Sequence, residues 1–134
     1  MDLVAHFHEA RSVVSVPSGL VLFRQGEPGT NMYVLMEGQA EVYVGDEVVE
    51  VAQAGALLGE MAMVNTTVRS ATVITRTDCR LVSIEMPQFD MLIRESPEFA
   101  RHVMTVIADR LRRVNERLKE ALGELSVRGR RPKP

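Results

Sequence analysis

Residues 32–51 read MYVLMEGQAEVYVGDEVVEV, and this stretch contains the clearest information about the fold. It contains three short apolar runs, separated by Gly38 and by Gly45-Asp46: residues 32–36, 40–44 and 48–51. Short runs rich in Val and Tyr are typical of strands, and Gly-Asp between two such runs is typical of a tight hairpin turn that needs a positive φ. The stretch therefore predicts consecutive β-strands joined by tight turns.

The same pattern continues on both sides of this stretch. Further strand-like runs, each bounded by turn residues, lie at residues 13–16, 20–23, 71–75 and 80–84. Such spacing, about 8–12 residues, is typical of antiparallel sandwiches and barrels. We therefore expect an antiparallel β-sandwich or roll over about residues 12–86.

Two helices are predicted after the roll. Pro87 suits the first turn of a short helix over residues 87–95, and Ser96-Pro97-Glu98 supplies the N-cap, proline and first-turn acid of a helix over residues 97–125. The second helix would be roughly 40 Å long, much longer than the ~13 Å radius of gyration of a small domain. It must project from the β body or lie along a partner.

Composition narrows the class of protein. The chain has 134 residues, a length typical of one domain, and its one cysteine excludes an internal disulfide or a cysteine-ligated cluster. It shows no leader sequence and no apolar run of about 20 residues, so we expect a cytoplasmic protein without a membrane span.

Residues 6–9 carry two histidines and a glutamate on a segment expected to fray, and they lack a third histidine nearby, so no metal site is expected. The chain also lacks a nucleophile–base pair or paired catalytic carboxylates, so we expect neither an enzyme nor a cofactor.

Charge is distributed unevenly along the chain. Residues 1–109 hold 7 Lys/Arg and 15 Asp/Glu, a net charge of −8, whereas residues 110–134 hold 9 basic and 3 acidic residues, a net charge of +6. The end of the chain, residues 126–134, is rich in Arg, Pro and Gly and is expected to be a disordered basic tail after a domain of residues 1–125. Without a folded reading head, DNA is not an expected partner.

The long predicted helix carries an apolar stripe. Its members alternate at spacings of four and three, the pattern of a two-stranded coiled coil: Ile107, Leu111, Val114, Leu118, Ala121 and Leu125. The stripe predicts a homodimer through this helix. The alternative is a single helix packed on its own domain.

The segment that carries chemistry is Gly59-Glu60-Met61-Ala62, followed by a strand that begins near Arg69-Ser70-Ala71. Strand alternation places Arg69 on the same face as Ala71 and Val73. Burying a charge on such an apolar face costs free energy unless an opposite charge compensates it. The partner of Arg69 could be Glu60 or an anion from outside. The turn at Gly59 opens into a short helical segment, where free backbone N–H groups favour a phosphate. Glu60 could accept hydrogen bonds from sugar hydroxyls.

These two motifs, with Glu60 and Arg69 nine residues apart, resemble the phosphate-binding cassette of cyclic-nucleotide-binding domains, found in the catabolite activator family and in protein kinase A regulatory subunits. The resemblance implies an eight-stranded antiparallel β-roll, a jelly-roll-like double-stranded β-helix, closed by a long C-terminal helix. It also implies a bound cyclic nucleotide, cAMP or alternatively cGMP. Its contacts would come from Gly59, Glu60, Met61, Ala62, Arg69, Ser70 and Ala71, and base contacts from Leu111, Val114 and Asn115.

Within that family pattern, Glu60 would bind the ribose 2′-hydroxyl, Arg69 the cyclic phosphate, and Ser70 the phosphate or base. Three hypotheses for function follow. The first is a non-enzymatic sensor that signals through its C-terminal helix to a downstream protein partner. The second is a ligand-free module for dimerisation or docking. The third is a stand-alone relative of the transcription regulators whose basic tail touches nucleic acid.

Overall fold

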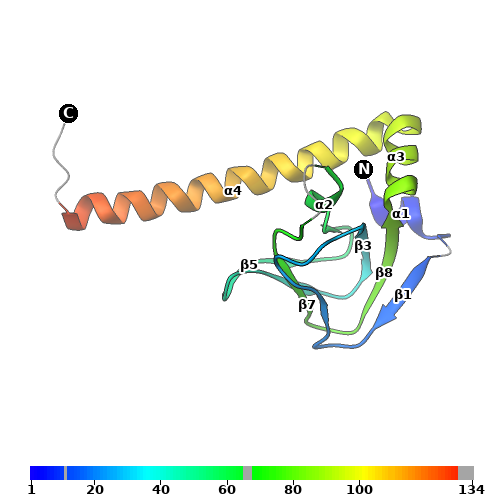
Figure 1. Ribbon diagram of the computed structural model, residues 1–134, viewed down its shortest axis with the longest axis horizontal. Coiled ribbons are helices and arrows are strands. Elements are labelled where there is room, and N and C mark those ends of the chain that lie inside the picture. Colours follow the sequence, from blue (N-terminus) through cyan, green and yellow to red (C-terminus); the bar gives the residue numbers. More distant parts are fainter. Residues whose placement is uncertain (11, 65–67, 130–134) are drawn as a thin grey trace.

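The computed structural model describes residues 1–10, 12–64 and 68–129, the last four of these by their backbone only. Within these residues, eight strands form a β-roll, and a long helix projects from one end of it (Figure 1). The strands are β1 (Val13–Val16), β2 (Val21–Phe23), β3 (Asn31–Glu37), β4 (Ala40–Val44), β5 (Glu47–Ala52), β6 (Leu57–Leu58), β7 (Thr72–Thr75) and β8 (Cys79–Glu85). The helices are α1 (Leu3–Phe7), α2 (Met61–Val64), α3 (Met86–Glu95) and α4 (Pro97–Gly129).

The strands form two four-stranded antiparallel sheets, with the orders β1-β8-β3-β6 and β2-β7-β4-β5. The hairpin between β4 and β5 turns at Gly45, whose φ of +59° explains why the turn requires glycine. The predicted roll and its hairpin are therefore confirmed. The two-residue strand β6 was not predicted, because it is too short to show alternation.

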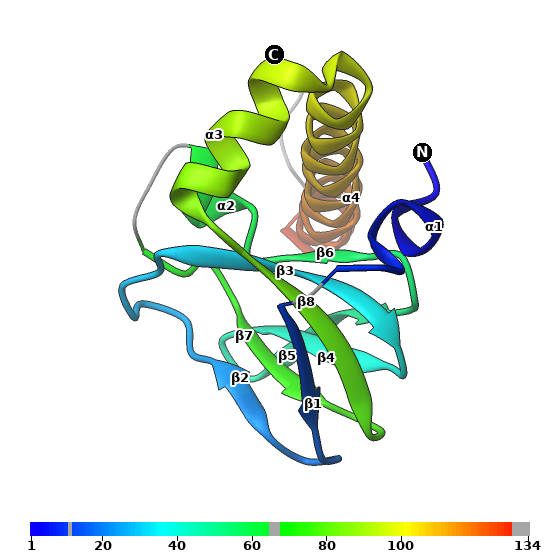
Figure 2. The ribbon, with the colours of Figure 1, turned by 90° about the vertical axis from the view of Figure 1, so that its right-hand side faces the viewer.

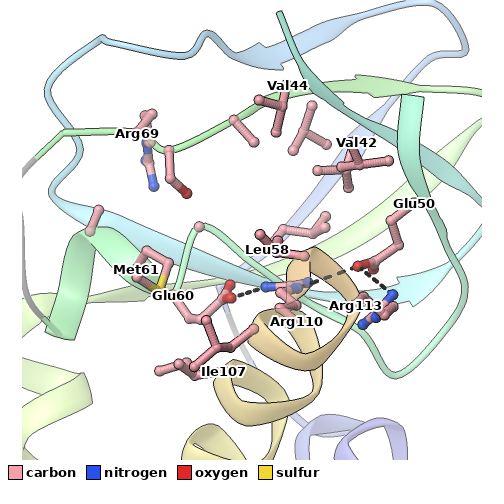
Figure 3. Close-up of a pocket in the computed structure, with 18 of the residues that line it drawn as sticks. Val42, Val44, Glu50, Leu58, Glu60, Met61, Arg69, Ile107, Arg110 and Arg113 are labelled. Atoms are coloured by element: carbon pink, nitrogen blue, oxygen red, sulfur yellow. Dashed lines mark hydrogen bonds and ion pairs between the residues drawn. The ribbon is translucent and has the colours of Figure 1, made fainter. Parts of the chain in front are cut away.

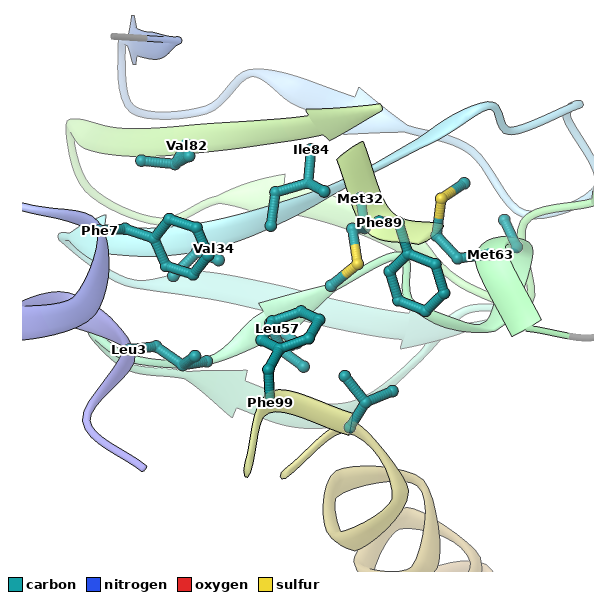
Figure 4. Close-up of a cluster of buried hydrophobic side chains, with 12 residues drawn as sticks. Leu3, Phe7, Met32, Val34, Leu57, Met63, Val82, Ile84, Phe89 and Phe99 are labelled. Atoms are coloured by element: carbon teal, nitrogen blue, oxygen red, sulfur yellow. The ribbon is translucent and has the colours of Figure 1, made fainter. Parts of the chain in front are cut away.

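Both faces of the β1-β8-β3-β6 sheet are buried along its central strands β3 and β8, which explains their nearly continuous apolar runs. Along β3, Val34 faces the helices and Leu35 faces the interior of the roll, as Val82 and Leu81 do along β8. Figure 4 shows the helix-side cluster, where Phe7, Phe89 and Phe99 gather over the sheet. The members of this cluster are Leu3, Phe7, Met32, Val34, Leu57, Ala62, Met63, Val82, Ile84, Phe89, Phe99 and Val103. This packing attaches α1, α3 and the start of α4 to the roll.

The helices differ from the predictions at both ends of the chain. The N-terminal segment expected to fray forms α1, because Asp2 accepts a hydrogen bond from the Ala5 N–H (3.1 Å) and Leu3 and Phe7 are buried. The predicted N-cap of α4 is confirmed by the Ser96 hydroxyl, which accepts from the Phe99 N–H (3.2 Å). The helix continues to Gly129, past the predicted end at residue 125. The rest of the predicted disordered tail, residues 130–134, lies outside the described residues.

Helix α4 has two distinct parts. Figure 1 shows α4 passing over the roll and projecting beyond β5, and Figure 2, viewed nearly along the axis of α4, shows its first part beside α3. Phe99 and Val103 are buried, but the described side chains from residue 111 to residue 125 are all exposed. In the part of the chain that the structure describes, no helix is long and apolar enough to cross a membrane.

Candidate functional site

A cavity of about 470 Å³ lies between the roll and α4, a size typical of small-molecule sites. Its walls are mostly apolar, with Phe23, Val42, Val44 and Val73 from the roll and Ile107 from α4 among the lining residues. Its charged lining residues are four arginines and two glutamates: Arg69, Arg110, Arg113, Arg117, Glu50 and Glu60. Although the chain as a whole is slightly acidic, the cavity therefore carries a formal charge of +2. It suits an amphipathic anion.

Arg69 lies at one end of the cavity, just before β7 (Figure 3). The turn after β2 holds its backbone, because the Arg69 N–H donates to the Glu27 carbonyl (2.8 Å) and the Gly26 N–H donates to the Arg69 carbonyl (2.9 Å). Its side chain crosses the ring of Phe23, with Cζ 4.2 Å from the centroid. The residue is only 6% exposed. A cation is thus held in the interior of the roll.

The Arg69 guanidinium has only part of its hydrogen bonding satisfied. Nη1 donates to the backbone oxygen of Asn31 (2.6 Å) and Nη2 donates to the Asn31 Oδ1 (2.7 Å). The buried Nε has no partner among the described residues. Burial lowers the pKa of Arg69 from its usual value, yet arginine remains charged in proteins. An unsatisfied buried cation of this kind is stabilised by an anion.

Two glycines make room for this guanidinium. A Cβ at Gly29 would lie 2.6 Å from Nε of Arg69, and one at Gly59 would lie 2.5 Å from its Nη1. Gly59 also adopts a φ of +80°, which favours glycine, and it leads through Glu60 into α2. The backbone thus approaches the Arg69 head closely on two sides. The predicted site residues Met61, Ala62, Ser70 and Ala71 line the same cavity.

Glu60 pairs with an arginine that the sequence analysis did not select. The Glu60 side chain, 1% exposed, accepts from Nη1 of Arg110 on α4. Arg110 also donates through Nη2 to the Leu57 carbonyl (2.7 Å) and through Nε to Oε1 of Glu50 on β5 (3.3 Å). Of the two partners considered for Arg69, Glu60 is therefore bound elsewhere, and the guanidinium of Arg69 contacts the side chain and backbone of Asn31 instead.

Three arginines of helix α4 bind the roll through ion pairs and hydrogen bonds. One turn beyond Arg110, Arg113 pairs with Glu50 (3.2 Å), and Nη2 of Arg117 donates to the Val49 carbonyl (2.9 Å). Figure 3 shows Glu50 between Arg110 and Arg113. Spacings of three and four place these arginines on one helix face, and this spacing could have identified them from the sequence. No pattern in the sequence indicated Glu50 on β5 as their acidic partner.

The three predicted base contacts separate in the structure. Leu111 and Val114 line the cavity, on the α4 side. Asn115 lies on the exposed surface of α4 and is not among the residues that line the cavity. The predicted dimer stripe also changes at its first member, because Ile107 packs against the core of its own domain.

Several known proteins are similar to this chain in sequence. The family model described as cyclic nucleotide-binding domain matches residues 13–96. A cyclic nucleotide-gated potassium channel of Rhizobium etli is 38% identical over 95 residues, which cover 71% of this chain and 26% of the channel. The cAMP-dependent protein kinase regulatory subunit of Schizosaccharomyces pombe is 33% identical over 95 residues, covering 70% of this chain and 23% of that subunit.

A solved structure shares the architecture. The catabolite activator protein of Thermus thermophilus superposes with a TM-score of 0.72 at 25% identity, over 81% of this chain and 54% of that chain. The chain spans about a quarter of the length of the two curated relatives above. The residues that the family model matches run from β1 into α3 and its C-cap.

Proposed function

Because the chain belongs to the cyclic nucleotide-binding domain family, we propose that it is a sensor that binds cAMP or cGMP in the cavity beneath α4 and signals through that helix. The observation that carries the proposal is Arg69. Its guanidinium is buried between two glycines, and its Nε has no partner among the described residues. A singly charged cyclic phosphate would supply both the missing acceptor and the missing negative charge.

The remaining cavity residues suit the rest of a nucleotide. Glu60 is an acceptor for the ribose 2′-hydroxyl, and Ser70 offers a hydroxyl to the phosphate or base. Backbone amides near Gly59, Met61 and Ala62 would complete the phosphate contacts, with Ala71 beside them. Leu111 and Val114 provide apolar contact for the purine. The proposed role is binding without catalysis.

Signalling would pass through the Glu60–Arg110 ion pair. Arg110 joins α4 to Glu60, Glu50 and the Leu57 carbonyl, so a ligand that engages Glu60 changes the contacts that hold α4 on the roll. Movement of α4 would alter a homodimer formed through its exposed apolar residues, which include Leu111, Val114, Leu118 and Leu125. The proposed readout is therefore the position of α4 within a dimer.

Calorimetric titration of the purified protein with cAMP and with cGMP tests the proposal. Replacement of Arg69 by alanine should weaken binding roughly 30-fold or more, because truncating one partner of a buried charge pair costs about 2–5 kcal/mol. Arg80→Ala is the matched control, since Arg80 forms a half-exposed pair with Glu37 (3.2 Å) away from the cavity. Circular dichroism verifies that both variants are folded. Absence of binding to either nucleotide at millimolar concentration, or unchanged affinity in Arg69→Ala, would contradict the proposal.

A further inference from the structure

The carboxylate of Glu50 is a charged group of the cavity that the proposed phosphate and ribose contacts do not use. It lines the cavity from β5, and its side chain is 16% exposed. Arg110 donates to it through Nε (3.3 Å) and Arg113 through Nη1 (3.2 Å), and both bonds end on Oε1. Neither of these bonds uses Oε2, so the carboxylate keeps an acceptor oxygen for a ligand.

The side chain of Arg113 places hydrogen-bond donors beside this acceptor. It lines the cavity from α4 and is 49% exposed. A guanidinium has five N–H donors. That of Arg113 donates through Nη1 to Glu50 and through Nε to the Asp109 carbonyl (3.5 Å), and neither bond uses Nη2. This end of the cavity therefore offers a ligand an acceptor and free donors next to each other.

The charged groups of the cavity follow the order of the parts of a cyclic nucleotide. Figure 3 shows Arg69 and Glu50 on opposite sides of the cavity, with the apolar side chain of Val42 near Glu50. The guanidinium of Arg110 contacts both Glu60 and Glu50, so the two carboxylates lie against the same group. In a nucleotide the base is attached to the ribose carbon next to the 2′-hydroxyl. With the phosphate on Arg69 and the 2′-hydroxyl on Glu60, the base therefore extends toward Glu50.

We infer that Glu50 and Arg113 contact the base and select guanine, so that cGMP binds more tightly than cAMP. The inference rests on the proposed function and specifies its ligand. Along one edge, guanine presents the O6 acceptor beside two neighbouring donors, N1–H and the 2-amino group. Nη2 of Arg113 donates to O6, and Oε2 of Glu50 accepts from the neighbouring donors of the base.

Adenine matches these two side chains less well. Its corresponding edge carries a 6-amino donor beside the N1 acceptor, and it has no amino group at position 2. In the orientation that suits guanine, the donors of Arg113 would face the 6-amino donor, and the carboxylate of Glu50 would face the N1 acceptor. A base turned over to bring its 6-amino group to Glu50 would give the carboxylate one donor instead of two. Polar groups left unpaired in the cavity lower the affinity for adenine.

Calorimetric titration of the full chain with three cyclic nucleotides tests the inference. The three are cGMP, cAMP and inosine 3′,5′-cyclic monophosphate, which keeps O6 and N1–H but lacks the 2-amino group. We expect cGMP to bind roughly tenfold more tightly than cAMP or better, a discrimination typical of paired contacts to one base. The inosine nucleotide should bind with an affinity between the two.

The variant Glu50→Gln should remove most of the preference for cGMP by weakening cGMP binding more than cAMP binding. If Glu50 served only to hold α4, the substitution would weaken both nucleotides alike and leave the ratio of the two Kd values unchanged. Glu47→Gln is the matched control, because Glu47 is an exposed residue at the start of β5 that does not line the cavity. Arg113→Met, with Arg112→Met as its control, provides a second measurement of the same ratio.

Circular dichroism verifies that each variant is folded. An affinity for cAMP equal to or higher than that for cGMP in the unsubstituted chain would overturn the inference and leave the sensor standing. An unchanged ratio in the folded Glu50→Gln and Arg113→Met variants would overturn it as well. Binding of none of the three nucleotides would overturn the proposed function together with the inference, so the two failures can be told apart.

Discussion

Arg110 is the cation that faces buried Glu60, and its replacement by methionine tests whether this pair fastens α4 to the cavity. The Glu60 side chain is 1% exposed and that of Arg110 is 25% exposed. Removing one partner of a fully buried pair costs about 3–5 kcal/mol, because an uncompensated charge remains. Since Arg110 is a quarter exposed, we expect a smaller loss of unfolding free energy, about 2–3 kcal/mol. For a domain of this size, the melting temperature should fall by roughly 3–5 °C for each kcal/mol.

The assay is urea and thermal unfolding at one fixed protein concentration, because a dimer makes the midpoint depend on concentration. The matched control is Arg112→Met, two residues along the same helix. Arg112 pairs with Asp109 (3.0 Å), and the two side chains are 67% and 47% exposed. A pair this exposed contributes about 0.5 kcal/mol or less. The two variants lose the same guanidinium and gain the same methionine.

A double-mutant cycle with Glu60→Gln separates the Glu60 contact from the contacts of Arg110 with Glu50 and Leu57. We expect a coupling energy between residues 60 and 110 of about 1.5 kcal/mol or more, as for close charge pairs elsewhere. Coupling near zero, or an Arg110→Met variant no less stable than Arg112→Met, would show that the pair does not fasten the helix. Helix α4 would then be held mainly by Phe99 and Val103.

Two further predictions concern packing and pH. Gly29→Ala places a Cβ 2.6 Å from Nε of Arg69 and should lower both the stability of the fold and its affinity for the nucleotide. Gly123→Ala, in open space on α4, should instead stabilise the fold by about 0.5–1 kcal/mol. Thermal melts and calorimetry check both variants, and unchanged affinity in Gly29→Ala would contradict the close approach. Burial, followed by the N-terminal ammonium, lowers the pKa of His102 although Glu98 opposes the shift, so the folded state binds the proton less well than the unfolded state. Stability should be constant above about pH 6.5 and fall as the pH drops from there toward the folded pKa, and a His102→Gln variant with an identical pH profile would contradict this.

Local chemistry explains why so much of the fold was predicted from the sequence. The hairpin needed only Gly45 between alternating strands, and α4 needed only Ser96 and Pro97 at its start, since these signals act on neighbouring residues. The predictions of structure failed where packing against residues distant in the sequence decides whether an element forms. Helix α1 forms because Leu3 and Phe7 find the outer face of the β1-β8-β3-β6 sheet, and no signal within a few residues reports that face.

In the candidate site too, local motifs identified some residues, and only tertiary packing brought in the others. Glu60 and Arg69 were identified because each lies in a recognisable motif. Asn31, Glu50 and Arg110 were missed, because each reaches the site from a different element, and Arg110 is fifty residues from Glu60 in the chain. The roles of Glu50 and Arg110 depend on where α4 crosses the roll, whereas that of Asn31 depends on where β3 lies beside Arg69.

The amino-acid sequence alone was enough to specify the strand pattern, the places where glycine is needed, the two helix starts, and the presence of an arginine and a glutamate in one motif. Which charges meet depended on the tertiary structure. Arg69 and Arg110 were both chemically able to pair with Glu60, and the packing of Phe99 and Val103 directs α4 so that Arg110 reaches it. Ion pairing depends on separations of a few ångströms, which periodicity in a sequence does not specify. The same packing leaves the buried Nε of Arg69 without a partner among the described residues, and that atom is the basis of the proposed nucleotide site.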